Sequence, residues 1–177
     1  MKITKPTDHN GWLDNYTKQV EGDDLLLLLQ DQVDLTIAFY QSLEPAQMDF
    51  RYAEGKWTPK EILSHLIDTE RVFGYRAMSF ARRDKTILPG YDEHLYALTT
   101  NASQRHIVAI LEEYAAARNS TIHLFKSFDA EMLDERGRAN NTEMSVRALG
   151  YATLGHELHH LRIIRERYLQ QVSPSLA

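Results

Sequence analysis

Four segments of the chain, each about twenty residues or longer, carry apolar residues at the three- and four-residue spacing of an amphipathic helix. They cover about residues 22–43, 58–82, 103–127 and 145–171. No alternating segment is long enough to predict a useful strand, and no internal repeat is evident. Four long helices in one small chain pack most economically as a bundle. The sequence therefore predicts an all-α four-helix bundle in a single domain over residues 1–177.

The segment 58–82 has the sharpest predicted helix start. Thr58 stands at the expected N-cap, Pro59 at the first helical position, and Glu61 three residues after the cap, which is the pattern of a capping box. Ser103 is the expected cap of the third helix. The polar, turn-rich stretch 129–144 lies between the third and fourth helices, and we expect it to be irregular.

Charge and composition exclude several classes of partner. The formal net charge of −5 gives no basic surface for nucleic acid, and the absence of cysteine excludes disulfides and thiolate ligands. The polar N-terminus does not resemble a signal peptide, and the leucine run 25–29 is too short to span a bilayer. We therefore expect a cytoplasmic protein with no membrane and no nucleic-acid partner.

The last predicted helix contains the string H-E-x-x-H, which runs from His156 through Glu157 to His160. In zinc peptidases, the glutamate of this string activates a metal-bound water. Such enzymes need a third protein ligand, and they take it from downstream of the string. Here no histidine follows His160, and the one later acid, Glu166, lies too close on the same helix. The peptidase interpretation is therefore disfavoured.

A third histidine is available upstream. On a helical wheel, His156 and His160 lie about 40° apart at the border of the apolar stripe, and His65 takes a similar border position on the second helix. Side chains from facing helices of a bundle can form one inward-facing metal site. Three imidazoles with open positions suit zinc or nickel. The alternative is three unrelated histidines near helix–helix contacts, and spacing alone leaves both open.

Two segments resemble the DinB superfamily, also called DinB/YfiT-like. Residues 55–93 match the tryptophan-led helix start of the family, its ligand histidine and the acid three residues later, and residues 145–169 match its closing H-x-x-x-H helix. The resemblance implies a four-helix bundle that holds one divalent metal ion through His65, His156 and His160. It makes Glu157 incidental to metal binding. It also implies a homodimer.

The resemblance implies two kinds of metal-dependent chemistry. Some relatives are transferases or isomerases that use low-molecular-weight thiols such as bacillithiol or mycothiol, and others are described as metal-dependent hydrolases. We expect a small-molecule enzyme that activates such a thiol for transfer to an electrophile. A hydrolase of a small ester or amide is the alternative, as is a non-catalytic metal-binding or stress-response module.

Several other residues are candidates near the site. Asp68 is either an acceptor of a hydrogen bond from a ligand imidazole or a solvated helix acid, and the sequence leaves both interpretations open. Arg76 shares the face of His65 and either binds a substrate carboxylate or forms an ion pair between helices. The loop 91–94 either caps the metal pocket or simply connects two helices. Trp12 and Trp57 are interpreted as packing anchors rather than ligand platforms.

Overall fold

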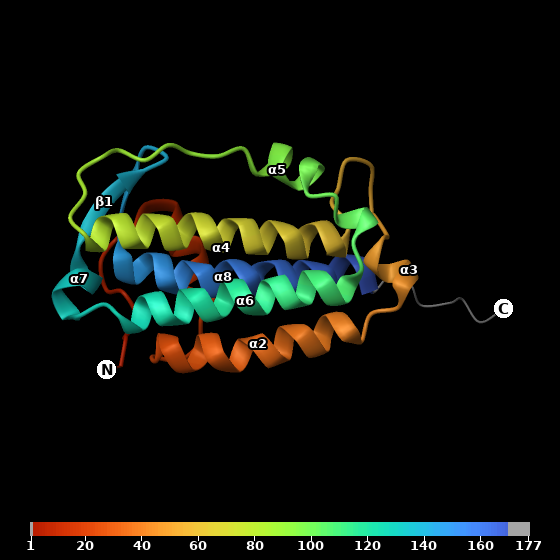
Figure 1. The fold of residues 1–177 in the computed structure, drawn as a ribbon, viewed down its shortest axis with the longest axis horizontal. Coiled ribbons are helices and arrows are strands. Elements are labelled where there is room, and N and C mark those ends of the chain that lie inside the picture. The colour runs from red at the N-terminus through yellow and green to blue at the C-terminus, as the bar shows by residue number, and fades with distance from the viewer. Residues whose placement is uncertain (1, 170–177) are drawn as a thin grey trace.

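The computed structural model describes residues 2–169, and four long helices form its body (Figure 1). They are α2 (Leu25–Gln41), α4 (Pro59–Ala81), α6 (Ile107–Lys126) and α8 (Val146–Ile163). The predicted helices are therefore present with trimmed ends. The final segment continues as a π-helical stretch, η3 (Ile164–Leu169), and residues 170 and 171 of the prediction lie outside the described residues.

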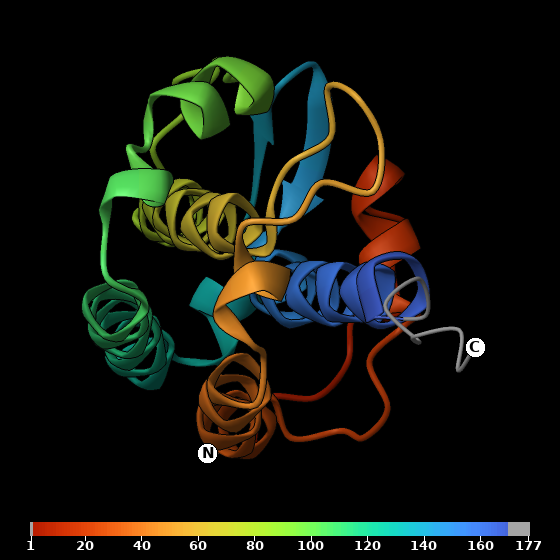
Figure 2. The ribbon, with the colours of Figure 1, turned by 90° about the vertical axis from the view of Figure 1, so that its right-hand side faces the viewer.

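The four helices form a ring that does not follow the order of the chain (Figure 2). Helix α4 packs against α6 and α8, and α2 packs against the same two helices. Consecutive helices α2 and α4 therefore lie across the bundle from each other, as do α6 and α8. This arrangement makes α4 and α8 neighbours, so residues far apart in the sequence can share one site.

The start of α4 is the predicted capping box. The Thr58 hydroxyl accepts a hydrogen bond from the backbone N–H of Glu61 at 3.2 Å, and the Glu61 carboxylate accepts from the backbone N–H of Thr58 at 2.8 Å. The predicted cap of the third helix is wrong. Ser103 belongs to a short 3-10 turn, and His106 caps α6 with its ring nitrogen. The turn of Ala102–Gln104 delays the helix by about four residues.

The prediction of an irregular stretch at 129–144 is wrong in part. After α7 (Ala130–Asp134), strands β1 (Arg136–Ala139) and β2 (Thr142–Ser145) form an antiparallel hairpin. Asn140 and Asn141 make its two-residue turn with positive φ angles of 48° and 60°, a conformation that asparagine tolerates well. Each strand has only four residues, which explains why alternation did not reveal it.

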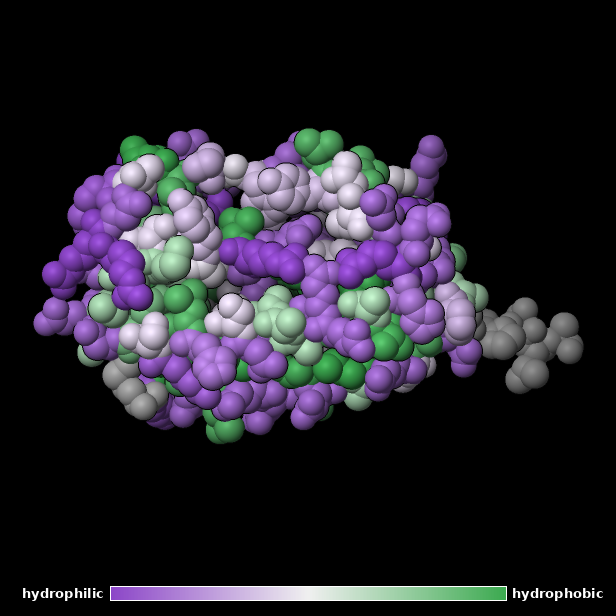
Figure 3. Space-filling view, in the orientation of Figure 1, coloured by the Kyte–Doolittle hydropathy of each residue, from purple (hydrophilic) through white to green (hydrophobic). Residues whose placement is uncertain are grey.

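The remaining elements are short. They are η1 (Gly11–Leu13), α1 (Asp14–Thr17), α3 (Pro45–Met48), α5 (Glu93–Thr99) and η2 (Ala102–Gln104). Of these, α3, α5 and η2 pack against α4, and α1 and η1 pack against α8. Mostly polar residues cover the face drawn in Figure 3, with hydrophobic residues scattered between them. Within residues 2–169, no helix is both long enough and apolar enough to span a membrane.

Candidate metal centre

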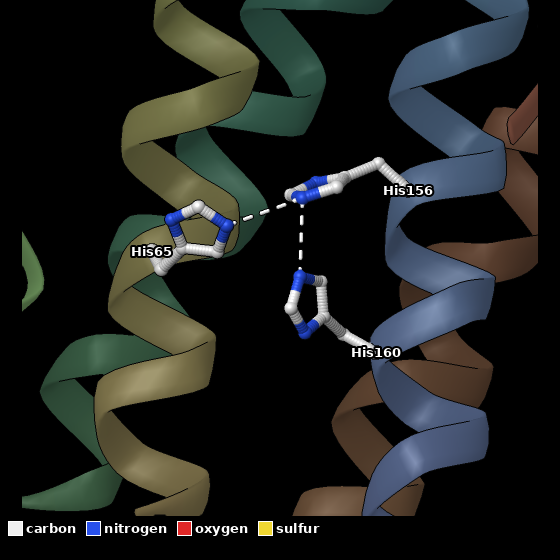
Figure 4. Close-up of side chains that lie close together, drawn as sticks. All are labelled: His65, His156 and His160. Atoms are coloured by element: carbon white, nitrogen blue, oxygen red, sulfur yellow. Dashed lines mark hydrogen bonds between the residues drawn. The ribbon is translucent and has the colours of Figure 1, made fainter. Parts of the chain in front are cut away.

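Three histidine side chains from α4 and α8 point toward one another inside the bundle (Figure 4). The Nε2 atom of His156 lies 3.1 Å from Nε2 of His65 and 3.1 Å from Nε2 of His160. His65 and His156 are buried, and His160 is partly buried. We call these three residues the histidine cluster. It unites the two halves of the sequence pattern, the H-x-x-x-H pair and the single upstream histidine.

One ring nitrogen from each of the three histidines lies within 4.8 Å of the other two, which is close enough for all three to share a single metal ion. Two nitrogens that each lie about 2.0–2.1 Å from a cation, at angles between octahedral and tetrahedral, stand about 2.8–3.4 Å apart. The two Nε2–Nε2 distances of 3.1 Å fall in this range. One ring nitrogen of a neutral imidazole carries no hydrogen, so converging nitrogens can present lone pairs to one point. Residues His65, His156 and His160 therefore fit a divalent metal.

The electrostatic environment keeps these imidazoles neutral. Burial lowers the pKa of His65 to about 4 and that of His160 to about 3, with smaller contributions from neighbouring histidines. Burial also holds the pKa of His156 well below its ordinary value. Metal ligation requires the unprotonated ring, so none of the three has to lose a proton at neutral pH before it can bind a cation.

A cavity of about 440 Å³ opens beside the histidine cluster. Helix α4 contributes a stripe of residues to its wall, and aromatic rings from other elements complete it. The Trp57 ring lies 4.7 Å from the His65 ring, and the Tyr16 ring lies 5.1 Å from the His156 ring, measured between centroids. A cavity of this size next to the nitrogens can hold a small organic molecule.

Close packing of the N-terminal segment on α8 places the Tyr16 ring in this wall. Gly155 precedes His156, and a Cβ atom built on it would lie 2.1 Å from the backbone oxygen of Tyr16. Only the absence of a side chain at Gly155 allows α1 to approach this closely. The glycine therefore helps to fix the Tyr16 ring against His156.

The structure does not bring Asp68 to the histidine cluster, contrary to the sequence prediction. Asp68 forms an ion pair with Arg71 at 3.6 Å. It lines a different surface pocket and not the cavity beside the histidine cluster, which we call the metal pocket. The side chain beside His65 Nδ1 is instead that of Thr69, whose hydroxyl lies 3.5 Å away. Thr69 also hydrogen-bonds the Tyr91 hydroxyl at 2.5 Å. Along this face of α4, the neighbour of His65 is therefore the residue four positions later, Thr69, and not the residue three positions later, Asp68.

Glu157, the acid of the H-E-x-x-H string, lies in a separate buried cluster. Its carboxylate pairs with Arg118 at 2.5 Å and accepts hydrogen bonds from the hydroxyls of Tyr114 and Thr36 at 2.6 and 2.5 Å. Arg118 also holds both carboxylate oxygens of Glu70, at 2.8 and 3.0 Å. We call these five residues the ion-pair cluster. It joins α2, α4, α6 and α8, and it gives Glu157 a structural role.

The structure places Arg76 in the wall of the metal pocket, as its position on the face of His65 suggested. The guanidinium donates from Nη2 to the backbone oxygen of Pro89 at 3.0 Å. No acidic side chain within residues 2–169 forms an ion pair with Arg76, so the alternative of a pair between helices has no partner there.

Sequence reasoning missed several residues of the pocket wall. Trp12 and Trp57, which are predicted only as packing anchors, line the cavity, and so does His94, which no pattern in the sequence singles out. The loop that holds Tyr91 reaches the pocket as well, so of the two interpretations of 91–94 the structure favours the cap. The available signal in the sequence was the loop 91–94 that follows Pro89. The spacing of its residues does not show which helix the loop crosses.

The fold and the converging histidines define a class: a four-helix bundle with a three-histidine, candidate metal-binding centre. The model of the DinB superfamily matches residues 14–164, so this chain belongs to that superfamily. Comparison with curated proteins found no match. Among solved structures, the chain is similar to YfiT from Bacillus subtilis, with a TM-score of 0.74 and 14% identity over 94% of this chain and 93% of that one.

YfiT is described as "a probable metal-dependent hydrolase with an unusual four-helix bundle topology". At 14% identity, this similarity shows that the two proteins share a fold, and it does not show that they share an activity. The predicted four-helix bundle of the DinB/YfiT type is confirmed.

Proposed function

We propose that this protein binds one divalent metal ion, zinc or nickel, through His65, His156 and His160, and that it transfers a low-molecular-weight thiol to an electrophile. The observation that carries the proposal is the convergence of three neutral Nε2 atoms at the wall of a cavity of about 440 Å³. Three protein ligands leave coordination positions free for exogenous molecules, as in catalytic sites.

A bound divalent cation supplies one kind of chemistry here, because it lowers the pKa of water or a thiol that reaches it. The side chains of the protein exclude water from the site and orient the ligand rings. The rings of Trp57 and Tyr16 pack against the histidines and exclude bulk water from one side. Thr69 contacts Nδ1 of His65 and so favours one orientation of that ring.

A metal-dependent hydrolase of a small ester or amide is the second candidate. The description of YfiT as a probable metal-dependent hydrolase favours it. The same neutral histidines and the same cavity serve both reactions. The two reactions differ in the nucleophile, which is a thiol in the transferase and water in the hydrolase. A non-catalytic metal-binding module is the third possibility, in which the cavity would take no reacting substrate.

The test begins with tag-free protein, because a histidine tag binds zinc and nickel itself. Metal content by mass spectrometry should give one zinc or nickel ion per chain. The metal-loaded protein is then assayed against small electrophiles with and without an added thiol. Turnover that depends on the thiol supports the transferase. Ester or amide cleavage without thiol would replace it with the hydrolase, and bound metal with neither activity would support the binding module.

A further inference from the structure

The two most deeply buried arginines of the described residues are in opposite electrostatic situations. Arg118 is 1% exposed and pairs with two carboxylates. Arg76 is 3% exposed, and no carboxylate within residues 2–169 lies in ion-pair distance of it. A guanidinium has five N–H donors, and the structure gives that of Arg76 one protein acceptor, the Pro89 oxygen. A buried cation without an anion is costly unless a ligand supplies the anion.

The pKa values of the two arginines follow this difference. Burial lowers the pKa of Arg76, and no carboxylate offsets the effect. Burial acts on Arg118 in the same direction, but Glu157 and Glu70 outweigh it and raise its pKa well above the ordinary value. Both guanidinium groups remain charged at neutral pH, because the intrinsic pKa of arginine is above about 12. Arg76 thus presents a positive charge that the described chain does not neutralise.

Arg76 belongs to the same wall as the histidine cluster. His65, Thr69, Phe73 and Arg76 follow one another on α4 at spacings of four, four and three residues, and all four line the metal pocket. The Cα atoms of His65 and Arg76 are separated by a rise of roughly 16 Å along the helix. Both side chains lean toward the N-terminus of the helix, and the longer arginine side chain reaches further in that direction, which shortens the gap to be spanned. A ligand that touches both ends must be elongated.

The surface between the two ends is largely aromatic. The Phe73 ring lies 6.1 Å from that of Trp12, and Tyr91 adjoins Thr69. Glu93 is the acid at the rim, and its exposure to solvent weakens its repulsion of an anion. Along the direction of α4, the pocket thus presents first the histidine cluster, then a largely apolar surface, and finally the buried guanidinium of Arg76.

We propose that Arg76 binds a carboxylate, and that the small molecule used at this site carries a carboxylate at the end remote from its reacting group. The inference names the substrate class of the proposed function and rests on it for the reaction, but not for the binding. A guanidinium matches a carboxylate in a two-pronged arrangement, which an amide or alcohol cannot replace. The carboxylate belongs either to the thiol or to the electrophile.

Binding can be measured with the intrinsic fluorescence of the protein. The chain has two tryptophans, and both line the pocket. Phenylbutyrate is titrated against its neutral amide, in full-length metal-free protein so that no cation competes for the carboxylate. We expect the acid to bind at least about tenfold more tightly than the amide. Arg76→Gln should abolish this preference and leave affinity for the amide unchanged, and Arg76→Lys should retain part of it.

Arg71→Gln is the matched control, because Arg71 is an arginine of the same helix outside this pocket. It should keep the wild-type preference for the acid. Circular dichroism checks the folding of each variant. If Arg76→Gln does not fold, the wild-type preference and its reduction in Arg76→Lys still test the proposal. Equal affinity for acid and amide in the wild type, or a preference that survives in Arg76→Gln, would overturn it.

Turnover then identifies the source of the carboxylate. Mercaptopropionate is compared with its amide as the thiol, and each electrophile with its own amide. Arg76→Gln should raise the KM of the reactant that bears the carboxylate and leave the KM of the other unchanged. These arms are independent of the fluorescence result. Acid preference without metal-dependent turnover would refute the proposed reaction only, and turnover without acid preference would refute the role of Arg76 only.

Discussion

His156 and Glu157 are adjacent in the chain, yet their side chains belong to two different buried polar clusters. Successive helical residues point about 100° apart, so α8 can present one to the pocket and the other to the bundle centre. In the ion-pair cluster, charged and hydroxyl groups satisfy one another. In the histidine cluster, three nitrogens face a shared point. Polar groups that satisfy one another's hydrogen bonds and charges are typical of a structural role. Like groups that converge on one point are typical of a ligand site.

The largest expected effect concerns the ion-pair cluster. Arg118→Met leaves the carboxylates of Glu70 and Glu157 buried without their cation, and we expect the free energy of unfolding to fall by about 3–5 kcal/mol. Urea unfolding of metal-free protein measures it. The control is Arg71→Met, because Arg71 also joins α4 to α6 through Glu113 but is half-exposed. It should lose no more than about 1 kcal/mol. Similar losses in both variants would remove the distinction between the clusters.

The next effect concerns metal affinity. His65→Ala leaves two ligands on α8, and we expect affinity for zinc to fall at least about a hundredfold, because even outer-shell changes cost ten- to a hundredfold. His160→Ala should cause a similar loss. Competition with a chromogenic chelator measures both. His159→Ala is the control, since this ring lines the pocket but is not among the three converging nitrogens. Full zinc occupancy in His65→Ala would contradict the proposed ligand set.

A smaller effect separates Glu157 from the metal. Glu157→Gln keeps the size of the side chain but weakens its bonds to Arg118, Tyr114 and Thr36. We expect a loss of about 1–3 kcal/mol in the free energy of unfolding, with one zinc ion per chain still bound. Urea unfolding and metal analysis of the same preparation measure the two quantities. Unchanged stability together with lost zinc would place Glu157 in the metal site instead.

The smallest effects compare two neighbours of His65. Thr69→Val removes the hydroxyl beside Nδ1, and the long contact of 3.5 Å leads us to expect zinc affinity weaker by about tenfold at most. Asp68→Asn should leave affinity unchanged, because Asp68 pairs with Arg71 and lines another pocket. The same chelator competition serves both variants. A larger loss in Asp68→Asn than in Thr69→Val would restore the role that the sequence suggested for Asp68.

Some parts of the fold and of the site were predictable because they depend on local geometry. The capping box of Thr58 and Glu61 involves residues three apart, and its two hydrogen bonds are present. The pairing of His156 with His160 follows from one turn of helix, and their Nε2 atoms lie 3.1 Å apart. The choice of Asp68 failed because a wheel gives directions around α4 and not the contacts that other elements make with it.

What the sequence by itself determined is therefore the set of long helices and the histidines that each one carries, since periodicity and capping are interactions within a few residues. Only the tertiary structure decided that α4 lies beside α8, which brings His65 to a residue 91 positions away. It also gave Glu157 its partners, the nearest of which in sequence is 39 residues distant. The physical reason is that helix adjacency follows from the packing of whole apolar faces, which no local pattern specifies.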